Sequence, residues 1–328
     1  MEEENNQSAE RHQLEWDRPR LKEIAKRQLE GRWTTPILAL LVMAFVLGII
    51  YFVYLAYTFK DSFMQGYAQG VQESSQNLNS EMLEEFLGES FADSLDDQEV
   101  LLSAEDYDVQ ADKLIKTTFV ELIFAILMAA LSAVFLIPFV KVLVTLSRTR
   151  EKAKFSDYMA SFSGTGKNFL AGLWQFLWEY IWILIPTAII LFASYYQLKY
   201  LTPFLEEGNT AVALQSLLCS LLIFLASIAS IVISIIKKIQ YRYMFNIIAE
   251  NPSISVRKAL TLSKKITNGY KLKLFAFDLS YLGWGMLGVI VLPVLLYVFP
   301  YMNMADLNAY HVIKNNAIVN GIVKEEDF

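Results

Sequence analysis

The chain has 328 residues, of which 55% are hydrophobic, and it contains several apolar runs longer than 18 residues. Runs of that length span a bilayer as helices, so the composition excludes an ordinary soluble domain and predicts an all-α, polytopic membrane helix bundle. The net charge of −6 hides a strong segregation of charge along the chain, and this segregation predicts the topology. A single cysteine, Cys219, excludes an intrachain disulfide and a multi-cysteine metal site.

The N-terminal segment, residues 1–35, is predicted to be a cytoplasmic tail followed by an interfacial helix. Residues 18–32 form its basic amphipathic part, and no signal-peptide pattern precedes them. Trp33 is expected to mark the membrane interface. The transmembrane domain is predicted over 36–313, and its first span over 36–57.

An acidic loop is predicted over residues 58–113, inserted in the transmembrane domain. Fourteen acidic residues lie between Asp61 and Asp112, so we expect the loop to be extracytoplasmic, and helical or partly disordered. Asp106, Asp108 and Asp112 lack the spacing of a helix-loop-helix calcium site, which favours a solvated charged loop. The loop is also a candidate surface for a membrane or extracytoplasmic protein partner.

Three further spans are predicted over about 117–140, 168–196 and 211–236. The helix of the second span is expected to continue past Pro138 into a basic segment.

The last apolar region, residues 272–313, is long for one span and short for two. We expect a tight hairpin with spans near 272–288 and 292–313, which returns the C-terminal tail, 314–328, to the cytoplasm. A basic or polar amphipathic piece, a glycine and an aromatic-flanked span recur three times along the chain. The sequence therefore predicts six spans in three helical-hairpin units, with cytoplasmic interfacial helices. Five spans, with the C-terminus outside, is the alternative.

The distribution of lysine and arginine sets the orientation. Segments 18–32, 141–167 and 237–273 hold 21 of these residues, whereas loops 58–116 and 197–210 hold four. The positive-inside rule then places the N-terminus in the cytoplasm.

A capped basic helix is predicted after Asn251-Pro252, where Ser253 or Ser255 can cap it. Its basic side chains suit a helix that lies on anionic lipid headgroups, and the lipid bilayer is the expected partner. Because the basic segments adjoin the spans, nucleic acid is not a predicted partner. The predicted lipid-interface residues are Trp33, Arg257, Lys258, Lys264 and Lys265.

Glu179 is the most conspicuous ionisable residue inside a predicted span. It lies 12 residues past Lys167, roughly 18 Å along a helix and near mid-membrane. Gln175 is one turn earlier on the same face. Ionisable groups at this depth are costly, so the two residues are a candidate proton, cation or substrate site. A protonated or hydrogen-bonded carboxyl that only joins helices is favoured over that functional interpretation.

A second polar group is predicted near the cytoplasmic ends of the later spans. Asp278 and Asp306 should lie at a level comparable to that of Lys238 and Arg242. A buried ion-pair cluster that ties spans together is favoured over a transport relay.

Enzymatic motifs are nearly absent. His12 and His311 form no two-histidine zinc motif, and Gly164–Lys167 lacks most features of a phosphate-binding loop. No catalytic residue, metal site or cofactor is therefore predicted.

Four segments carry a resemblance: IAKRQLEGRW near the start, SDYMASF in the middle, the run from Glu250 through Trp284, and LYVFPYMN after it. In these segments the chain resembles the bacterial integral membrane family numbered nine hundred and seventy-five among the domains of unknown function. The chain departs from the family at Ile233 and Ser234, where the family often has a Pro-Gly pair. The resemblance implies a multi-span protein of the bacterial plasma membrane and supplies no activity.

The predicted function is that of a non-enzymatic, membrane-embedded interaction or envelope-associated protein. The alternative is a small-molecule or ion transporter that uses Glu179, Asp278 and Asp306 as intramembrane carboxylates. A membrane enzyme comes third.

Overall fold

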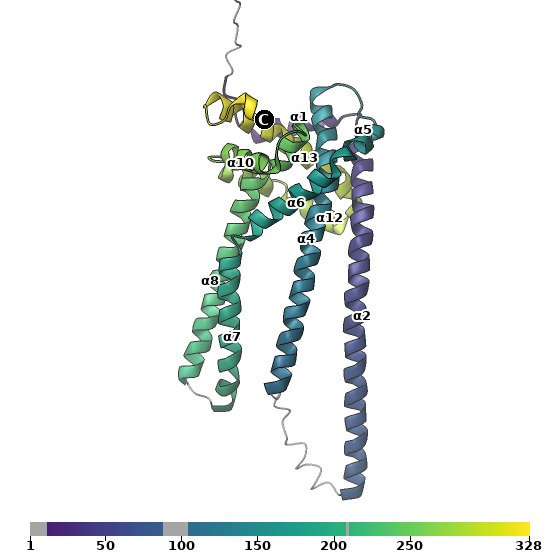
Figure 1. Ribbon diagram of the computed structural model, residues 1–328, viewed down its shortest axis with the longest axis vertical. Coiled ribbons are helices and arrows are strands. Elements are labelled where there is room, and N and C mark those ends of the chain that lie inside the picture. Colours follow the sequence, from purple (N-terminus) through teal and green to yellow (C-terminus); the bar gives the residue numbers. More distant parts are fainter. Residues whose placement is uncertain (1–11, 88–103, 208–209) are drawn as a thin grey trace, which may run out of the picture. The chain divides into compact units, whose positions relative to one another are not determined.

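The computed structural model describes residues 12–87, 104–207 and 210–328, and this part of the chain contains helices and no strand (Figure 1). The chain divides into two compact units, Met1–Met43 with Leu127–Phe328, and Ala44–Ile126. The all-helical class predicted from the composition is therefore confirmed.

The smaller unit, Ala44–Ile126, consists of parts of two long helices. Helix α2 covers Thr34–Leu87 and helix α4 covers Ala104–Arg148. Within the unit they meet at Tyr54 and Phe124, whose rings stack with centroids 3.8 Å apart. The predicted acidic loop is thus helical at both ends, and its middle lies outside the described residues. Its extracytoplasmic location stays a prediction.

In the larger unit, the C-terminal part of α4 continues through Pro138 to Arg148, as predicted. The third predicted span is bent by 54° between α6, Thr165–Tyr180, and α7, Leu184–Glu207. Helix α8, Thr210–Tyr241, packs along α7. Most large apolar side chains of these two helices are exposed, as expected of helices that contact lipid.

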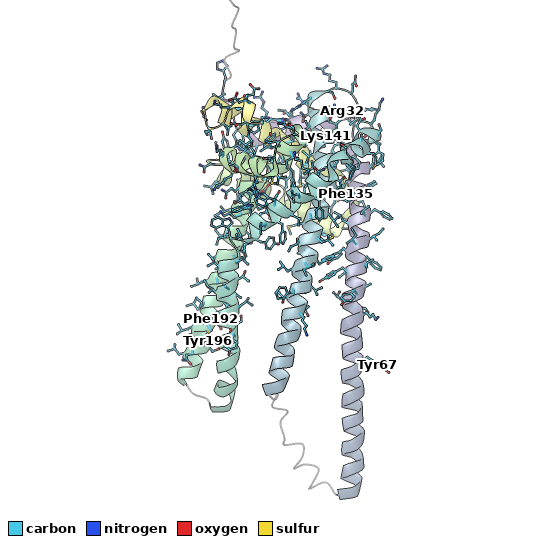
Figure 2. All side chains as sticks on the ribbon, in the orientation of Figure 1. Arg32, Tyr67, Phe135, Lys141, Phe192 and Tyr196 are labelled. Carbon is cyan, nitrogen blue, oxygen red and sulfur yellow. The ribbon has the colours of Figure 1, made fainter. Side chains whose placement is uncertain are left out.

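Two basic and two aromatic side chains mark different levels of this unit. Figure 2 shows Arg32 and Lys141 toward one end of the unit, and Phe192 and Tyr196 toward the other end of α7. Arg32 donates to the backbone carbonyl of Thr149 at 2.6 Å, so the basic end is also tied together by hydrogen bonds.

Length and composition identify the candidate spans. Four helices among the described residues are long and apolar enough to cross a membrane, or up to five if each bent pair is one span. These findings show a helical membrane protein. The six spans and the three hairpin units stay predictions.

Helices α4 and α6 approach each other closely at Gly172. A Cβ added there would lie 2.7 Å from the Ala129 carbonyl oxygen and 2.8 Å from the Ala133 Cβ. Small residues at such crossings allow membrane helices to pack backbone against backbone.

Replacing Gly172 by alanine should therefore lower the free energy of unfolding by about 1–3 kcal/mol, because the clash is with backbone. Gly166→Ala on the same helix is the control, since nothing lies within 4 Å of a Cβ at that position. Thermal unfolding of both variants in detergent checks the prediction. Equal Tm values for the two would contradict the close approach.

The two ends of the described chain pack together. Helix α1, Arg18–Leu29, lies against α13, Leu295–Val319, and buries Leu21, Ala25 and Leu29. Just before α1, the Leu14 amide donates to the Asn316 side chain at 2.7 Å, and Asn316 Nδ2 donates to the Leu14 carbonyl at 2.8 Å. These reciprocal bonds place both ends on one side of the molecule.

Helix α10, Val256–Ile266, is the capped basic helix predicted from the sequence. The Ser255 hydroxyl accepts a hydrogen bond from the Lys258 amide at 3.3 Å, which confirms the predicted cap. The Ser263 hydroxyl donates to the Gln240 carbonyl, so α10 also satisfies a backbone group at the end of α8. The apolar face of α10 packs on α6, α8, α9 and α13 rather than standing free.

The last apolar region folds back on itself. Helix α11 covers Lys271–Leu279 and α12 covers Leu282–Ile290. A short turn, η2 at Leu292–Val294, then reverses the chain into α13, and Leu295 approaches Gly288 across the turn. The remaining short elements are α5 at Phe155–Ala160, η1 at Ser161–Gly164, α9 at Met244–Glu250 and η3 at Glu325–Asp327.

Candidate functional site

Arg242 lies immediately after the end of α8 and bridges two carboxylates that are far apart in the sequence. Its Nη1 donates to both carboxylate oxygens of Asp278, each at 2.7 Å. Its Nε donates to Asp306 Oδ1 at 2.7 Å. Because Asp278 belongs to α11 and Asp306 to α13, the guanidinium joins three helices at one point. We call these three residues the Arg242 centre.

The Arg242 centre is only partly open. The exposed fraction of the side chain is 21% for Arg242, 16% for Asp306 and 42% for Asp278. The Tyr243 hydroxyl donates a further hydrogen bond to Asp306 Oδ1 at 3.2 Å. One cation thus faces two carboxyl groups, and Asp278 is the one more accessible to a ligand.

A cavity of about 670 Å³, which we call the Arg242 chamber, opens beside this centre. Its polar lining residues include the Arg242 centre. Its apolar lining residues come largely from α4, α8 and α13. Six of its apolar lining residues are Leu136, Val140, Ile235, Ile239, Phe299 and Met302. A lining that combines charged and apolar side chains suits an amphipathic small molecule.

The chamber brings together five of the six polar residues singled out from the sequence. The five are Gln175, Lys238, Arg242, Asp278 and Asp306. The sixth, Glu179, accepts a hydrogen bond of 2.7 Å from Gln175 Nε2, as their one-turn spacing predicts. Gln175 Oε1 is buried and has no hydrogen-bond partner in the described part of the chain. This acceptor is free for the donor group of a ligand.

A second ionic cluster centres on Glu250, the last residue of α9, whose side chain is 7% exposed. Glu250 Oε1 accepts from Arg148 at 2.5 Å and lies 3.2 Å from His311 Nε2. Glu250 Oε2 accepts from Lys314 at 2.6 Å and from the Tyr310 hydroxyl at 2.8 Å. We call these five residues the Glu250 cluster.

The Glu250 cluster is a structural tie rather than a ligand site. Burial first of all, and then the neighbouring Glu250 carboxylate, hold the pKa of Tyr310 well above its usual range. The phenol therefore stays protonated and keeps donating to Glu250. Both carboxylate oxygens are fully used, and the cluster fastens α4 and α9 to α13.

Sequence reasoning missed the Glu250 cluster, because it used Glu250 only as part of the Glu-Asn-Pro motif. One available signal was the three-residue spacing of His311 and Lys314, which puts an imidazole and an ammonium group on one helix face.

The predicted lipid-interface residues occupy several environments. Arg257 lies over the Trp174 ring, with its guanidinium carbon 4.9 Å from the ring centroid, and Lys258 pairs with Asp327 at 3.3 Å. Lys264 and Lys265 are exposed. Trp33 contacts Tyr297, with ring centroids 5.7 Å apart. Contact of any of them with lipid stays a prediction.

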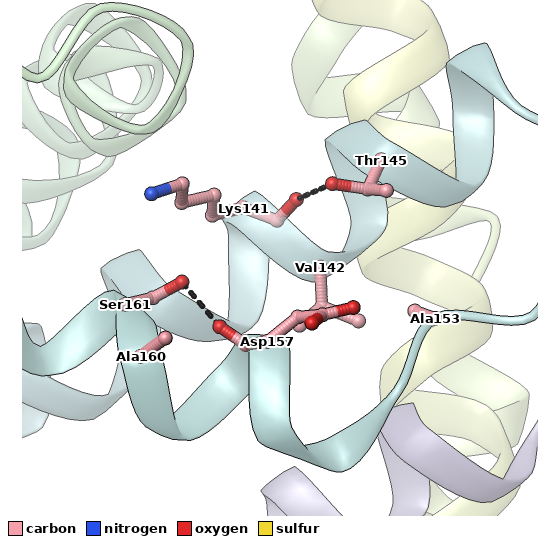
Figure 3. A pocket seen from close by; sticks show the side chains of 7 residues that line it. All are labelled: Lys141, Val142, Thr145, Ala153, Asp157, Ala160 and Ser161. Carbon is pink, nitrogen blue, oxygen red and sulfur yellow. Dashed lines mark hydrogen bonds between the residues drawn. The ribbon is translucent and has the colours of Figure 1, made fainter.

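Other polar sites are less suited to binding. A shallow pocket of about 250 Å³ lies between α4 and α5 (Figure 3). Its hydroxyl groups are engaged by backbone, since Thr145 donates to the Lys141 carbonyl and Ser161 to the Asp157 carbonyl. Within the described ranges, no group of three or more metal-ligating side chains could hold a metal ion.

Comparison with known proteins identifies a family and no individual relative. No curated protein and no solved structure matches the chain. One family model does match, over residues 108–317, and its description is "Protein of unknown function (DUF975)". The match covers more than half of the chain and includes both the Arg242 centre and the Glu250 cluster. The chain therefore belongs to the DUF975 family, as its sequence motifs predicted.

Proposed function

We propose that this integral membrane protein is a non-enzymatic binding protein that holds an amphipathic small molecule in the Arg242 chamber. The observation that supports the proposal is the mixed lining of the chamber, which combines ionic groups with apolar side chains in one cavity. A headgroup with an amino group would pair with Asp278 and the free Gln175 oxygen. An acidic part of the same headgroup would pair with Lys238, and the chain or ring would lie against Phe299 and Ile239.

Non-enzymatic binding is favoured over catalysis by the state of the two carboxylates. A carboxylate acts best as a general base or nucleophile when no cation is already paired with it. Both oxygens of Asp278 and one oxygen of Asp306 already accept hydrogen bonds from Arg242. Such pairing holds the carboxylates as fixed charges, which suits recognition.

Transport of the bound molecule is the second candidate function. Glu179 and Gln175 extend the polar path from the chamber along α6, one helical turn further from Lys167. A relay of this kind is how intramembrane carboxylates serve transporters. A binding protein would retain the molecule in a proteoliposome, whereas a transporter would move it across the bilayer.

We place this function in the bacterial plasma membrane, with the N-terminus in the cytoplasm and anionic lipid headgroups beside the basic segments. The segregation of lysine and arginine along the chain supports that orientation. A protein partner for the acidic loop is a further proposal, motivated by its 14 acidic residues.

Filling the chamber should remove the bound molecule. Ile235 lines the chamber and does not belong to the Arg242 centre, so Ile235→Trp should occupy the cavity without breaking an ion pair. Ile231→Trp is the matched control, because Ile231 lies one turn earlier on α8, is exposed, and does not line the chamber. Native mass spectrometry in mild detergent compares small molecules and lipids bound to the wild type and to both variants.

The wild type and Ile231→Trp should retain the same bound molecule at about one per protein, and Ile235→Trp should lose it. Equal abundance of all three proteins in membranes excludes misfolding as the cause. Identical bound species in all three samples would refute the proposed site.

A further inference from the structure

We propose that residues 282–297, the tip of the α12–η2–α13 turn, form a shallow re-entrant segment. This segment contacts the acyl chains of one leaflet, the leaflet on the same side of the membrane as the two ends of the chain. The chain as a whole crosses the membrane four times. This proposal replaces the six predicted spans and is independent of what the Arg242 chamber binds.

The contact between the two ends of the chain limits the number of crossings. Leu14 and Asn316 exchange hydrogen bonds of 2.7 and 2.8 Å, and Asn315 donates to the His12 carbonyl at 3.0 Å. Backbone groups within hydrogen-bond distance lie on the same side of a bilayer whose apolar core is about 30 Å thick. The chain between these residues therefore crosses an even number of times.

An even number leaves four or six crossings. Helices α2, α4 and α8, together with the bent pair α6 and α7, supply four candidate spans. The segment Lys271–Ile290 is the one further candidate, and α13 is not among the candidates. Crossing by Lys271–Ile290 alone would give five, which contradicts the contact between the ends. This segment and α13 thus either cross together or turn back together.

The depth of the turn decides between these outcomes. Tyr297, near the start of α13, contacts Trp33, which precedes the first residue of α2 and follows Arg32. Phe299, two residues after Tyr297, contacts Phe139, and their ring centroids are 5.8 Å apart. Phe139 itself lies two residues before Lys141. Both partners lie next to basic residues at the ends of their spans, so this part of α13 lies at the membrane interface.

The turn is too short to cross from that level. Ile290, at the end of α12, lies seven positions before Tyr297. In a helix these seven positions would extend roughly 10 Å. Even a fully extended chain, at about 3.3 Å per residue, would reach roughly 23 Å, still short of the apolar core of about 30 Å.

The side chains of the turn fit the interior of a leaflet. Val289 and Ile290 are each 81% exposed, and their exposed neighbours Leu282, Met286 and Leu292 are also apolar. A contiguous apolar surface of this kind is costly in water and is matched by acyl chains. The backbone stays helical through most of the turn, which keeps its polar groups paired at membrane depth.

Single-cysteine labelling in a Cys219→Ser background tests the proposal. The test position is Ile290→Cys, and its high exposure means that the substitution removes little packing. Ile322→Cys, after the end of α13, reports the side of the chain ends, and Glu206→Cys, at the far end of α7, reports the opposite side. An impermeant maleimide, applied from each side of oriented vesicles, reports which cysteines are accessible from that side. In a separate sample, the solubilised protein is labelled with an environment-sensitive maleimide and then reconstituted.

Ile322→Cys and Glu206→Cys should label from opposite sides. Ile290→Cys should label from neither side, and its fluorophore should be quenched by spin-labelled lipids in the leaflet on the Ile322 side. Labelling of Ile290→Cys from the Glu206 side would establish a full crossing and overturn the proposal. Labelling from the Ile322 side by the polar reagent would place the tip in water and overturn it equally.

Discussion

Replacing Glu250 by alanine should prevent most of the protein from reaching a stable folded state. The side chain is 7% exposed and accepts hydrogen bonds from Arg148, Tyr310 and Lys314. Removing one member of a buried ionic network leaves its partners uncompensated, at a cost of about 3–5 kcal/mol. Since a typical domain is stable by only about 5–15 kcal/mol, the steady-state amount of the variant should fall several-fold.

Thermal unfolding in detergent and the amount of protein in membranes both report this effect. Glu23→Ala is the matched control, because Glu23 forms an exposed i,i+4 pair with Arg27 at 2.6 Å, and such pairs contribute about 0.3–0.5 kcal/mol. Glu250→Gln should fall between the two, since it keeps an acceptor oxygen and loses the charge. A Tm for Glu250→Ala equal to that of Glu23→Ala would show that the Glu250 cluster does not hold α4, α9 and α13 together.

Replacing Arg242 by leucine should be nearly as damaging, for the opposite reason. Asp278 and Asp306 would then face each other without the cation that joins them, and Asp306 is largely shielded from water. An uncompensated buried charge again costs about 3–5 kcal/mol.

Neutralising both carboxylates in the same chain should recover most of that loss. The combined variant R242L, D278N and D306N keeps the shapes of the two acidic side chains and removes all three charges. Residues in one ionic network are not independent, so its Tm should lie well above that of Arg242→Leu alone. A triple variant less stable than the single one would mean that the charges act separately, and the Arg242 centre would not be the unit described above.

The components of the Arg242 centre could be predicted from the sequence because each is a charged residue in an otherwise apolar segment. Distance from the flanking basic residues placed Asp278, Asp306 and Arg242 at one level of the membrane, and the structure brings all three within hydrogen-bond distance. The pair Gln175 and Glu179 followed from the 3.6-residue period in the same way. The depth of each residue in the membrane did not predict the chamber, because the volume of the chamber depends on how α4, α8 and α13 pack.

The Glu250 cluster and the turn after α12 were harder to predict, since both depend on contacts between distant segments. Glu250 is 60 residues from Tyr310, and nothing local indicates that α13 returns beside α9. The polar residues along α13, such as Asn308 and Asn316, were consistent with the end of a sixth span. They instead bind α1 and the residues before it, because Asn308 donates to Gln28 and Asn316 to the Leu14 carbonyl.

The two ionic clusters have complementary roles in the proposed function. The Glu250 cluster fixes α13 against α4 and α9, and α13 in turn carries Asp306, Phe299 and Met302 to the chamber. A site of this kind requires rigid elements behind it, because misplacement by about 1 Å weakens recognition. Loss of Glu250 should therefore affect binding only together with stability, whereas Ile235→Trp should affect binding alone.

The most direct measurement of the central claim is the structure of the purified protein in lipid nanodiscs, determined by electron cryomicroscopy. The account predicts elongated density in the Arg242 chamber, with its polar end within hydrogen-bond distance of Gln175 or Lys238 and its other end against Ile239 and Phe299. A chamber closed by the side chains of α8 and α13, or one that holds only water, would contradict it.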